Sequence, residues 1–318
     1  MSRLRLAVGS TAAQQAADPV GSARADYENT FRERKGDYTN RFPSIHAFHD
    51  ITPNLKARLS WSTSFGRPAP SNLLPGETID ETNRRLTVNN PSLRPQTAKN
   101  WDATLEYYFE PVGSLTLGWF HKEIREFIIS NQDVRVIPGG LENGYDGEYE
   151  GWTERTSLNG GTAIAQGWEF SYSQQFTFLP GLLKGLAASY NYTWIDTHGL
   201  YTGTRYLTRR EVAGFIPAAS NLTLSWRYRN FNTRVLYNFT GEYIAGFNAA
   251  NPALSTYRYS FPTVNWGMGY QLKPSLGFSV DVANVFNEPQ QVYQGYKDRL
   301  RQSISNFITV TVGMNGRF

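Results

Sequence analysis

The C-terminal segment alternates between apolar and polar residues. One face holds Ile304, Ile308, Val310, Val312, Met314 and Phe318, and serine, threonine, asparagine and arginine occupy the other. Neighbouring side chains of a strand point to opposite faces, so such a strand has two different environments. An apolar face turned to lipid and a polar face turned to a wet interior are typical of a transmembrane β-barrel strand.

The same alternation recurs upstream and predicts an all-β chain of about twelve antiparallel strands. The expected strands are residues 3–13, 42–50, 55–65, 98–109, 114–129, 165–177, 185–196, 219–229, 231–243, 257–272, 275–286 and 304–318. Strand 42–50 is the weakest of them, because its residues give no clear apolar face. Every charge in the strands is expected on the polar face, because a charge facing lipid would cost about 2–4 kcal/mol. In strand 275–286, for example, Leu276, Phe278 and Val280 face away from Asp281.

Short and long connections alternate along the chain. The short ones are residues 52–54, 110–113, 178–184, 230 and 273–274, and the long ones are 14–41, 66–97, 130–164, 197–218, 244–256 and 287–303. Outer-membrane barrels have short periplasmic turns and longer extracellular loops. The C-terminus is therefore expected at the periplasmic side.

Composition favours a membrane barrel over a soluble β-sandwich. The chain has no cysteine, 14% aromatic residues and a net charge of +4 without a basic cluster, which excludes disulfides and gives no sign of nucleic-acid binding. Its mean hydropathy is −0.47, and no stretch reaches the roughly 18 apolar residues of a spanning helix. The expected strands, at about 10–16 residues, also exceed the 5–6 residues usual in soluble sheets.

The N-terminal sequence MSRLRLAVGS begins with basic residues, but no sustained apolar segment or small-residue cleavage site follows. An exported protein needs such a signal peptide. We therefore expect the chain to lack its beginning.

Several segments resemble the C-terminal part of TonB-dependent outer-membrane receptors. Ser64–Gly76 (SFGRPAPSNLLPG) resembles a strand end and its loop, and Asn89–Phe109 (NNPSLRPQTAKNWDATLEYYF) resembles the family's GNPxLKPxxSxNxDLxLEYYF block. Glu110–Ile128 continues that block, and Leu179–Leu186 and Asn284–Gln290 match further positions. The chain departs from the family's pattern at three positions: Asn89 stands where glycine is usual, Ala98 where serine is usual and His121 where tyrosine is usual. The resemblance covers essentially the whole chain.

The resemblance implies a 22-stranded barrel filled by an N-terminal plug, with residues 1–318 supplying a single, incomplete barrel domain without the plug. It implies TonB-dependent uptake, across the bacterial outer membrane, of a bulky scarce nutrient of the iron–siderophore or oligosaccharide class. The expected partners are the TonB complex, acting through the missing N-terminal region, the barrel assembly machinery and outer-membrane lipid. Val310, Val312, Met314 and Phe318 are the expected outer-membrane insertion signal.

No catalytic set is apparent, so neither enzymatic activity nor a cofactor is expected. His46 and His49 are three residues apart, which puts them on opposite faces of a strand and argues against a metal site. Asp102 and Glu106 lie on one face about 13 Å apart, a separation that suits salt bridges in the barrel interior better than acid–base catalysis. Lys56 and the arginines at 58, 227, 234 and 317 are expected to pair with these carboxylates or with the plug.

Ligand binding is expected in the long loops. The candidates are Tyr145, Tyr149, Trp152, Tyr201, Arg205, Tyr206, Tyr243, Tyr293, Tyr296 and Arg299. Aromatic faces with amide and guanidinium donors suit sugars or aromatic chelates. The alternative for each residue is an interfacial aromatic belt or packing of the loops on themselves.

Two alternatives to the transport function stay open. One is a self-contained barrel, either a porin or an enzyme resembling an outer-membrane phospholipase, which would need a Ser/His pair that His121 and His198 do not evidently supply. The other is a non-functional fragment of a receptor.

Overall fold

The computed structural model describes residues 16–18, 20–22, 39–74, 76–199, 212–248 and 251–316. The chain forms two compact units, one of residues 1–42, 70–92 and 133–156 and the other of 43–69, 93–132 and 157–318. Among the described residues, no helix has the length and apolar character to cross a membrane.

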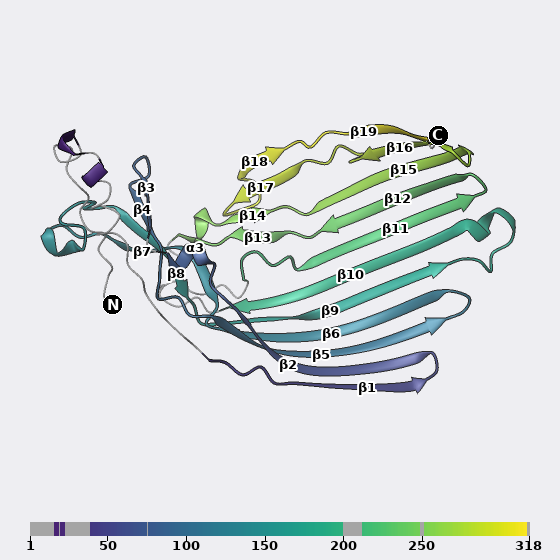
Figure 1. The fold of residues 1–318 in the computed structure, drawn as a ribbon, viewed down its shortest axis with the longest axis horizontal. Coiled ribbons are helices and arrows are strands. Elements are labelled where there is room, and N and C mark those ends of the chain that lie inside the picture. The colour runs from purple at the N-terminus through teal and green to yellow at the C-terminus, as the bar shows by residue number, and fades with distance from the viewer. Residues whose placement is uncertain are drawn as a thin grey trace. The chain divides into compact units, whose positions relative to one another are not determined.

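The larger unit contains one antiparallel sheet of eleven strands, each paired with its neighbour in chain order. Figure 1 shows the strands side by side, joined by tight turns at one end. The strands are β1 (Ser44–Thr52), β2 (Leu55–Gly66), β5 (Gln96–Phe109), β6 (Gly113–Arg125), β9 (Thr162–Gln175), β10 (Leu186–Gly199), β11 (Ala218–Tyr228), β12 (Phe231–Thr240), β15 (Phe261–Lys273), β16 (Leu276–Ala283) and β19 (Thr309–Gly316). The all-β prediction is confirmed, and strand 3–13 lies outside the described residues.

Registers confirm the predicted faces, because directly opposite residues share a face. Trp119 pairs with Trp168, and Trp168 pairs with Trp194. These tryptophans form a row across three strands, at the middle of β6 and β9 and in the loop-side half of β10. We call them the tryptophan row.

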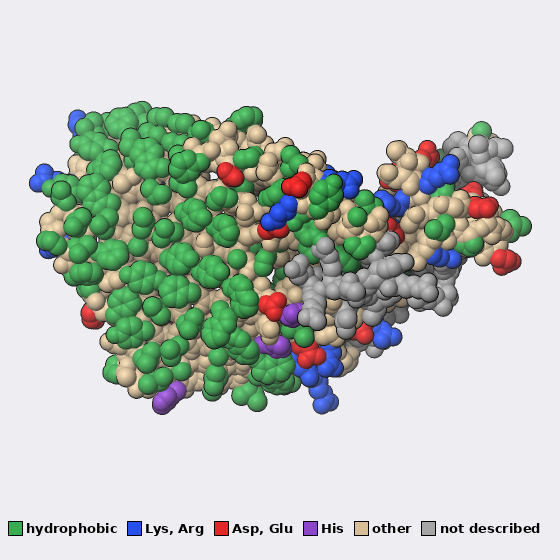
Figure 2. All heavy atoms as spheres, turned by 180° about the vertical axis from the view of Figure 1, so that it is seen from behind, with side chains coloured by type: hydrophobic (Ala, Val, Ile, Leu, Met, Phe, Trp, Pro, Cys, Tyr) green, Lys and Arg blue, Asp and Glu red, His purple; other side chains and the backbone are tan. Residues whose placement is uncertain are grey.

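Aromatic residues also lie near the tight turns. Phe109 stacks on Tyr107 and on Tyr172, with ring centroids 5.7 and 6.2 Å apart. Eight residues separate Phe109 from Trp101 along β5, which is about 27 Å along a strand and about 21 Å after a tilt of ~40°. This height approaches the roughly 25 Å apolar band of outer-membrane barrels. Figure 2 shows this face covered by hydrophobic side chains.

The expectation that every charge lies on the polar face needs correction at the strand ends. Lys99 pairs with Glu123 on the same face as Trp101, and Asp196 follows Trp194 on that face. These charges come after the tryptophan row, on the side of the long loops. They therefore sit at the level of lipid headgroups, where the cost of a charge falls to about 0–1 kcal/mol.

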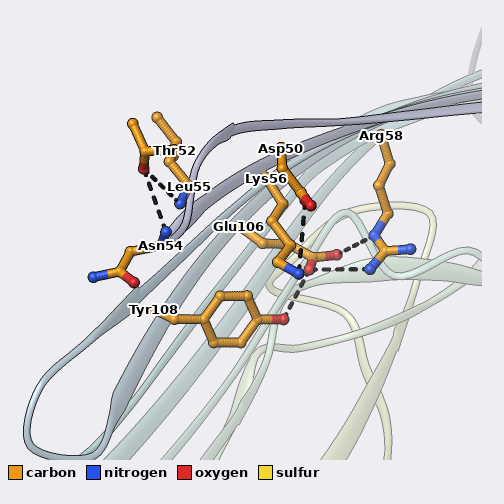
Figure 3. A network of polar contacts seen from close by, with 8 residues as sticks. All are labelled: Asp50, Thr52, Asn54, Leu55, Lys56, Arg58, Glu106 and Tyr108. Atoms are coloured by element: carbon orange, nitrogen blue, oxygen red, sulfur yellow. Dashed lines mark hydrogen bonds and ion pairs between the residues drawn. The ribbon is translucent and has the colours of Figure 1, made fainter.

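The opposite face of the sheet is polar. Arg58 donates from Nε to Glu106 Oε1 at 2.8 Å, and Tyr108 donates its hydroxyl to Glu106 Oε2 at 2.8 Å. Figure 3 shows this group beside the β1–β2 turn, with Lys56 Nζ 3.6 Å from Asp50 Oδ1. The predicted salt bridge of Glu106 is confirmed.

Asp102 instead accepts a hydrogen bond from Ser60 Oγ at 3.2 Å. Arg234 pairs with Asp281 at 3.1 Å. Arg317 lies outside the described residues. The polar face therefore carries cross-strand ion pairs and hydrogen bonds of the kind expected for a wet interior.

Strand β1, whose face the sequence leaves undecided, is resolved by its partner. Ile45 lies opposite Trp61 and Ala47 opposite Leu59, so these two residues belong to the apolar face. Phe48 lies opposite Arg58 on the polar face, where 79% of its surface is exposed. Phe48 on the polar face and His49, opposite Ala57, on the apolar face together obscure the alternation.

Two predicted long loops of the larger unit are wrong in part, because each contains short strands. Residues 243–304 include β13 (Tyr243–Gly246), η3 (Pro252–Leu254), β14 (Thr256–Arg258), β17 (Gln290–Gln294) and β18 (Leu300–Ile304). The four strands form a separate sheet in the order β13-β14-β17-β18. The short connection between β9 and β10 also contains a 3₁₀ turn, η2 (Gly181–Gly185).

Three predicted strands are interrupted for the same reason. Ile304 ends β18 of the small sheet, and Thr309 begins β19 of the large one. Between them Phe307 takes a φ of 53°, which breaks an extended strand. Likewise the predicted strand 231–243 breaks after Thr240, and 257–272 breaks before Phe261. The alternation continues through each break while the chain changes sheets.

The smaller unit includes residues 70–92 and 133–156, which belong to the predicted long loops 66–97 and 130–164. A sheet of order β3-β4-β8-β7 contains β3 (Glu77–Asp80), β4 (Arg85–Val88), β7 (Ile128–Val136) and β8 (Thr153–Asn159), of which β3, β4, residues 133–136 and residues 153–156 belong to the smaller unit. Helix α3 (Pro70–Leu73) and the 3₁₀ turn η1 (Leu141–Asn143) complete it. Leu86 and Ile137, 0% and 1% exposed, form its interior. The predicted strand 114–129 therefore ends at Arg125, and Ile128 begins β7.

Candidate ligand-binding surface

Three predicted ligand-binding residues come together in the smaller unit. The rings of Tyr145 and Tyr149 meet edge to face with centroids 5.7 Å apart, and Tyr149 meets Trp152 in the same way at 5.2 Å. All three side chains are half-buried. We call them the aromatic triad. Such edge-to-face contacts fix the ring orientations and leave part of each ring accessible to a ligand.

A buried asparagine holds the loop that carries the triad. Asn143 is 3% exposed, and its Oδ1 accepts from the backbone N–H groups of Tyr145 at 2.7 Å and Gly147 at 3.1 Å. Its Nδ2 donates to the carbonyl oxygen of Glu148 at 2.8 Å. Gly147 has a φ of 86°, which glycine adopts without strain. One side chain thus replaces regular secondary structure in fixing the loop.

Ion pairs join the strands of the sheet to one another, and one of their arginines also donates a hydrogen bond to the loop. Arg135 donates from Nε to Glu154 Oε2 at 2.6 Å and from a terminal nitrogen to the carbonyl oxygen of Asn143 at 3.3 Å. Asp133 lies 2.7 Å from Arg155 Nε and 3.8 Å from Arg85 Nε. The acidic side chains are only 10% and 18% exposed, so these pairs are better shielded from solvent than surface salt bridges.

The surroundings of the triad are acidic. Burial raises the pKa of Tyr149 above its ordinary value of 10.0, and the charges of Glu77, Glu148 and Glu81 raise it further. The side-chain amide of Asn83 lowers the pKa of Asp80 by donating a hydrogen bond of 2.8 Å to the carboxylate. Glu77, Glu81 and Glu148 therefore lie near the Tyr149 ring of the triad.

The remaining described candidates lie in the larger unit, in and beside the small sheet. Tyr293 is 4% exposed; it stacks on Tyr257 with centroids 4.8 Å apart and meets Tyr259 edge to face at 4.8 Å. Tyr293, Tyr257 and Ile244 form a hydrophobic core. In this arrangement Tyr293 packs the loops together rather than presenting its ring to solvent.

Hydrogen bonds and an ion pair fix the β17–β18 hairpin in place. Glu242 accepts from the Tyr293 hydroxyl at 2.8 Å and pairs with Lys297 Nζ at 2.8 Å. The Tyr259 hydroxyl donates to the Lys297 carbonyl oxygen. Glu242 raises the pKa of Lys297 by hydrogen bonding and by charge. At the hairpin tip, Tyr296 is 64% exposed.

The other candidates are dispersed. Tyr243 pairs with Arg258 in the small sheet and is half-buried, and Arg299 is exposed. Tyr201, Arg205 and Tyr206 lie outside the described residues. Of the expected insertion signal, the side chains of Val310, Val312 and Met314 are 60%, 74% and 70% exposed on the apolar face of β19, and Phe318 lies outside the described residues.

Within the described ranges, no group of histidine, aspartate and glutamate side chains could hold a metal ion. His46 lies opposite Ser60 and His49 opposite Ala57, so their side chains point to different faces, as predicted. Sequence reasoning missed Asn143, Glu242 and Lys297. Asparagine flanked by glycines in ENGYDG was the one available signal for Asn143, whereas nothing in the sequence pairs Glu242 with Lys297.

The sequence matches the family described as "TonB dependent receptor-like, beta-barrel" over residues 18–287. The chain belongs to this family, whose members are receptors and transporters rather than enzymes, and it is an outer-membrane β-barrel protein. No curated protein sequence matches it.

Solved structures of similar fold are outer-membrane receptors and transporters. The ferric enterobactin receptor PfeA of Pseudomonas aeruginosa, in complex with enterobactin, aligns with a TM-score of 0.63 and 14% identity over 87% of this chain and 40% of its own. The ferric-catecholate import receptor Fiu of E. coli K12 aligns with a TM-score of 0.59 and 15% identity over 86% of this chain and 34% of its own. The copper transporter OprC aligns with a TM-score of 0.58 and 13% identity over 86% of this chain and 38% of its own. The chain thus spans well under half of each structure.

Proposed function

We propose that this chain forms part of the wall and the extracellular ligand-binding loops of a receptor that takes up a bulky, scarce nutrient by TonB-dependent transport. Family membership is the observation that carries the proposal. The polar inner face and the folded loops support it, because a transport barrel needs a wet interior and a binding surface. The protein acts by binding and transport and catalyses no reaction.

The described residues form an open sheet, which supports a role within a larger barrel. Its eleven strands are antiparallel throughout, so the first and last strands, β1 and β19, run in the same direction. An odd number of further strands is needed to close an antiparallel barrel, because backbone groups at an open edge cannot stay unpaired in lipid. Eleven more would complete a 22-stranded barrel.

The aromatic triad is the proposed ligand contact, with Tyr243, Tyr296 and Arg299 as further contacts in the larger unit. We propose Tyr201, Arg205 and Tyr206 as contacts on their sequence alone. Tyr293 contributes by holding its hairpin in place. Carboxylates bordering the triad accept hydrogen bonds from hydroxyl groups and repel anions. Of the two nutrient classes, this chemistry favours an oligosaccharide over an anionic iron–siderophore at the triad.

Two partners follow from the proposed function. The TonB complex supplies energy through the plug region of the complete receptor, and the barrel assembly machinery inserts the barrel by way of its C-terminal strand. The exposed apolar side chains of β19 support the second role.

Uptake in cells tests the proposal. Cells carrying the gene should accumulate a radiolabelled oligosaccharide or ferric siderophore, whereas cells lacking the gene or TonB should not. Accumulation that does not depend on TonB would refute the transport mechanism and favour a porin.

Binding at the triad is tested separately. Quenching of tryptophan fluorescence by maltodextrins or ferric siderophores should report ligand binding, and replacing Tyr145 and Tyr149 with alanine should weaken it at least tenfold. Replacing Tyr237, which lies in β12 away from these loops, is the matched control. Unchanged affinity in the double variant would exclude the triad as the ligand contact.

A further inference from the structure

The lipid-facing side of the large sheet contains an apolar groove of about 580 Å³. Ala57, Leu59, Ala103, Leu105, Leu117 and Trp119 line it, together with Trp168. Its volume falls within the ~300–1,000 Å³ typical of small-molecule sites.

Two alanines create the groove. Ala57 lies opposite Leu105, and Ala103 lies between Leu59 on β2 and Trp119 on β6. Each alanine therefore has larger side chains beside it on the same face. The short methyl groups form the floor of the groove, and leucine and tryptophan side chains form its walls.

The groove lies in the half of the apolar band near the long loops. Trp119 and Trp168 belong to the tryptophan row, and Ala103 is two residues from Trp101 on the same face of β5. The loop-bearing end is the extracellular end of an outer-membrane barrel. The groove is thus at the depth of acyl chains of the outer leaflet.

Cationic side chains lie beyond the groove on the side of the long loops, at the level of lipid headgroups. Lys99 is exposed on the same face as Ala103, four residues or about 13 Å further along β5. Arg125 lies on the adjacent strand; its side chain is 60% exposed and pairs with Glu123 at 2.9 Å. On β5 and β6, the two cations Lys99 and Arg125 and the anion Glu123 together carry one net positive charge above the groove.

We propose that this groove binds an acyl chain of one anionic outer-leaflet lipid, whose phosphate Lys99 and Arg125 bind. The apolar walls select a hydrocarbon chain, and the net positive charge selects an anionic headgroup. Trp101 lies between the groove and Lys99 along β5, at the interface that tryptophan prefers in membranes. The site is distinct from the extracellular ligand-binding loops and faces away from the barrel interior.

Lipid retention tests the proposal. Protein extracted from outer membranes in mild detergent is examined by native mass spectrometry, which counts bound lipids. Filling the groove by Ala103→Phe or Ala57→Phe should lower lipid retention at least fivefold. Ala188→Phe is the matched control, because Ala188 lies on the same face of β10 outside the groove. Equal retention in all four proteins would overturn the proposal.

The headgroup is tested by adding defined lipids to delipidated protein. Lys99→Gln should reduce binding from phosphatidylglycerol vesicles at least threefold and leave binding from phosphatidylcholine vesicles unchanged. Equal binding of both lipids to the unmodified protein would overturn the charge selection.

A spectroscopic readout covers the case in which a phenylalanine variant fails to assemble. The chain contains no cysteine, so Ala103→Cys or Ala188→Cys can carry a single nitroxide label. Phosphatidylglycerol vesicles should immobilise the label at position 103 and not at position 188. Equal responses at the two positions would show general lipid contact and overturn the proposal.

Discussion

A charge placed on the lipid face of β11 tests the membrane placement directly. Leu222 lies four residues from Trp226, near the tight turns, and four from Ala218, which pairs with Trp194 of the tryptophan row. It is therefore midway between the two aromatic belts, about 13 Å along the strand from each. Arginine at the midplane costs about 2–4 kcal/mol, so Leu222→Arg should reduce the folding equilibrium constant about 30- to 700-fold.

The adjacent residue supplies the control. Thr223 pairs with Ser189 on the polar face, so Thr223→Arg adds the same side chain where water can solvate it. Urea unfolding in lipid vesicles, followed by heat-modifiable gel mobility, measures both variants. Equal destabilisation by the two substitutions, or none by Leu222→Arg, would refute the assignment of faces.

Further predictions concern the triad loop and the C-terminal strand. Asn143→Ala should destabilise the triad loop by about 1–3 kcal/mol, seen as faster proteolysis there with unchanged barrel mobility on gels. Because the pKa of Tyr149 is raised, its stabilising contribution is complete below pH 10 and declines as pH rises through the raised pKa. Glu77→Gln should lower that pKa in an absorbance titration of the phenolate, and an unchanged titration would exclude the carboxylate as a cause. Val312→Ser should reduce the amount of assembled barrel in the outer membrane more than Thr311→Ser, and equal effects would argue against an insertion signal on the apolar face.

Much of the large sheet follows from sequence, because a lipid-facing strand must alternate at nearly every position. Most turns were also predictable: β1 ends at Thr52, whose Oγ1 accepts from the N–H groups of Asn54 and Leu55 at 3.3 and 3.0 Å. Aromatic loop residues were predictable as a class. Their separate roles were not, since the same residue type is half-buried in the triad at Tyr149 and fully packed at Tyr293.

The sequence by itself determined the membrane setting, the strand order and the faces of most strands, because a period of two can satisfy lipid on one side and water on the other. Tertiary structure alone decided where strands leave the sheet, as between Ile304 and Thr309, because local alternation continues when the pairing partner changes. It also brought Glu242 to Lys297 and opened the groove between Ala57 and Ala103. These features depend on register between distant segments, which no local pattern encodes.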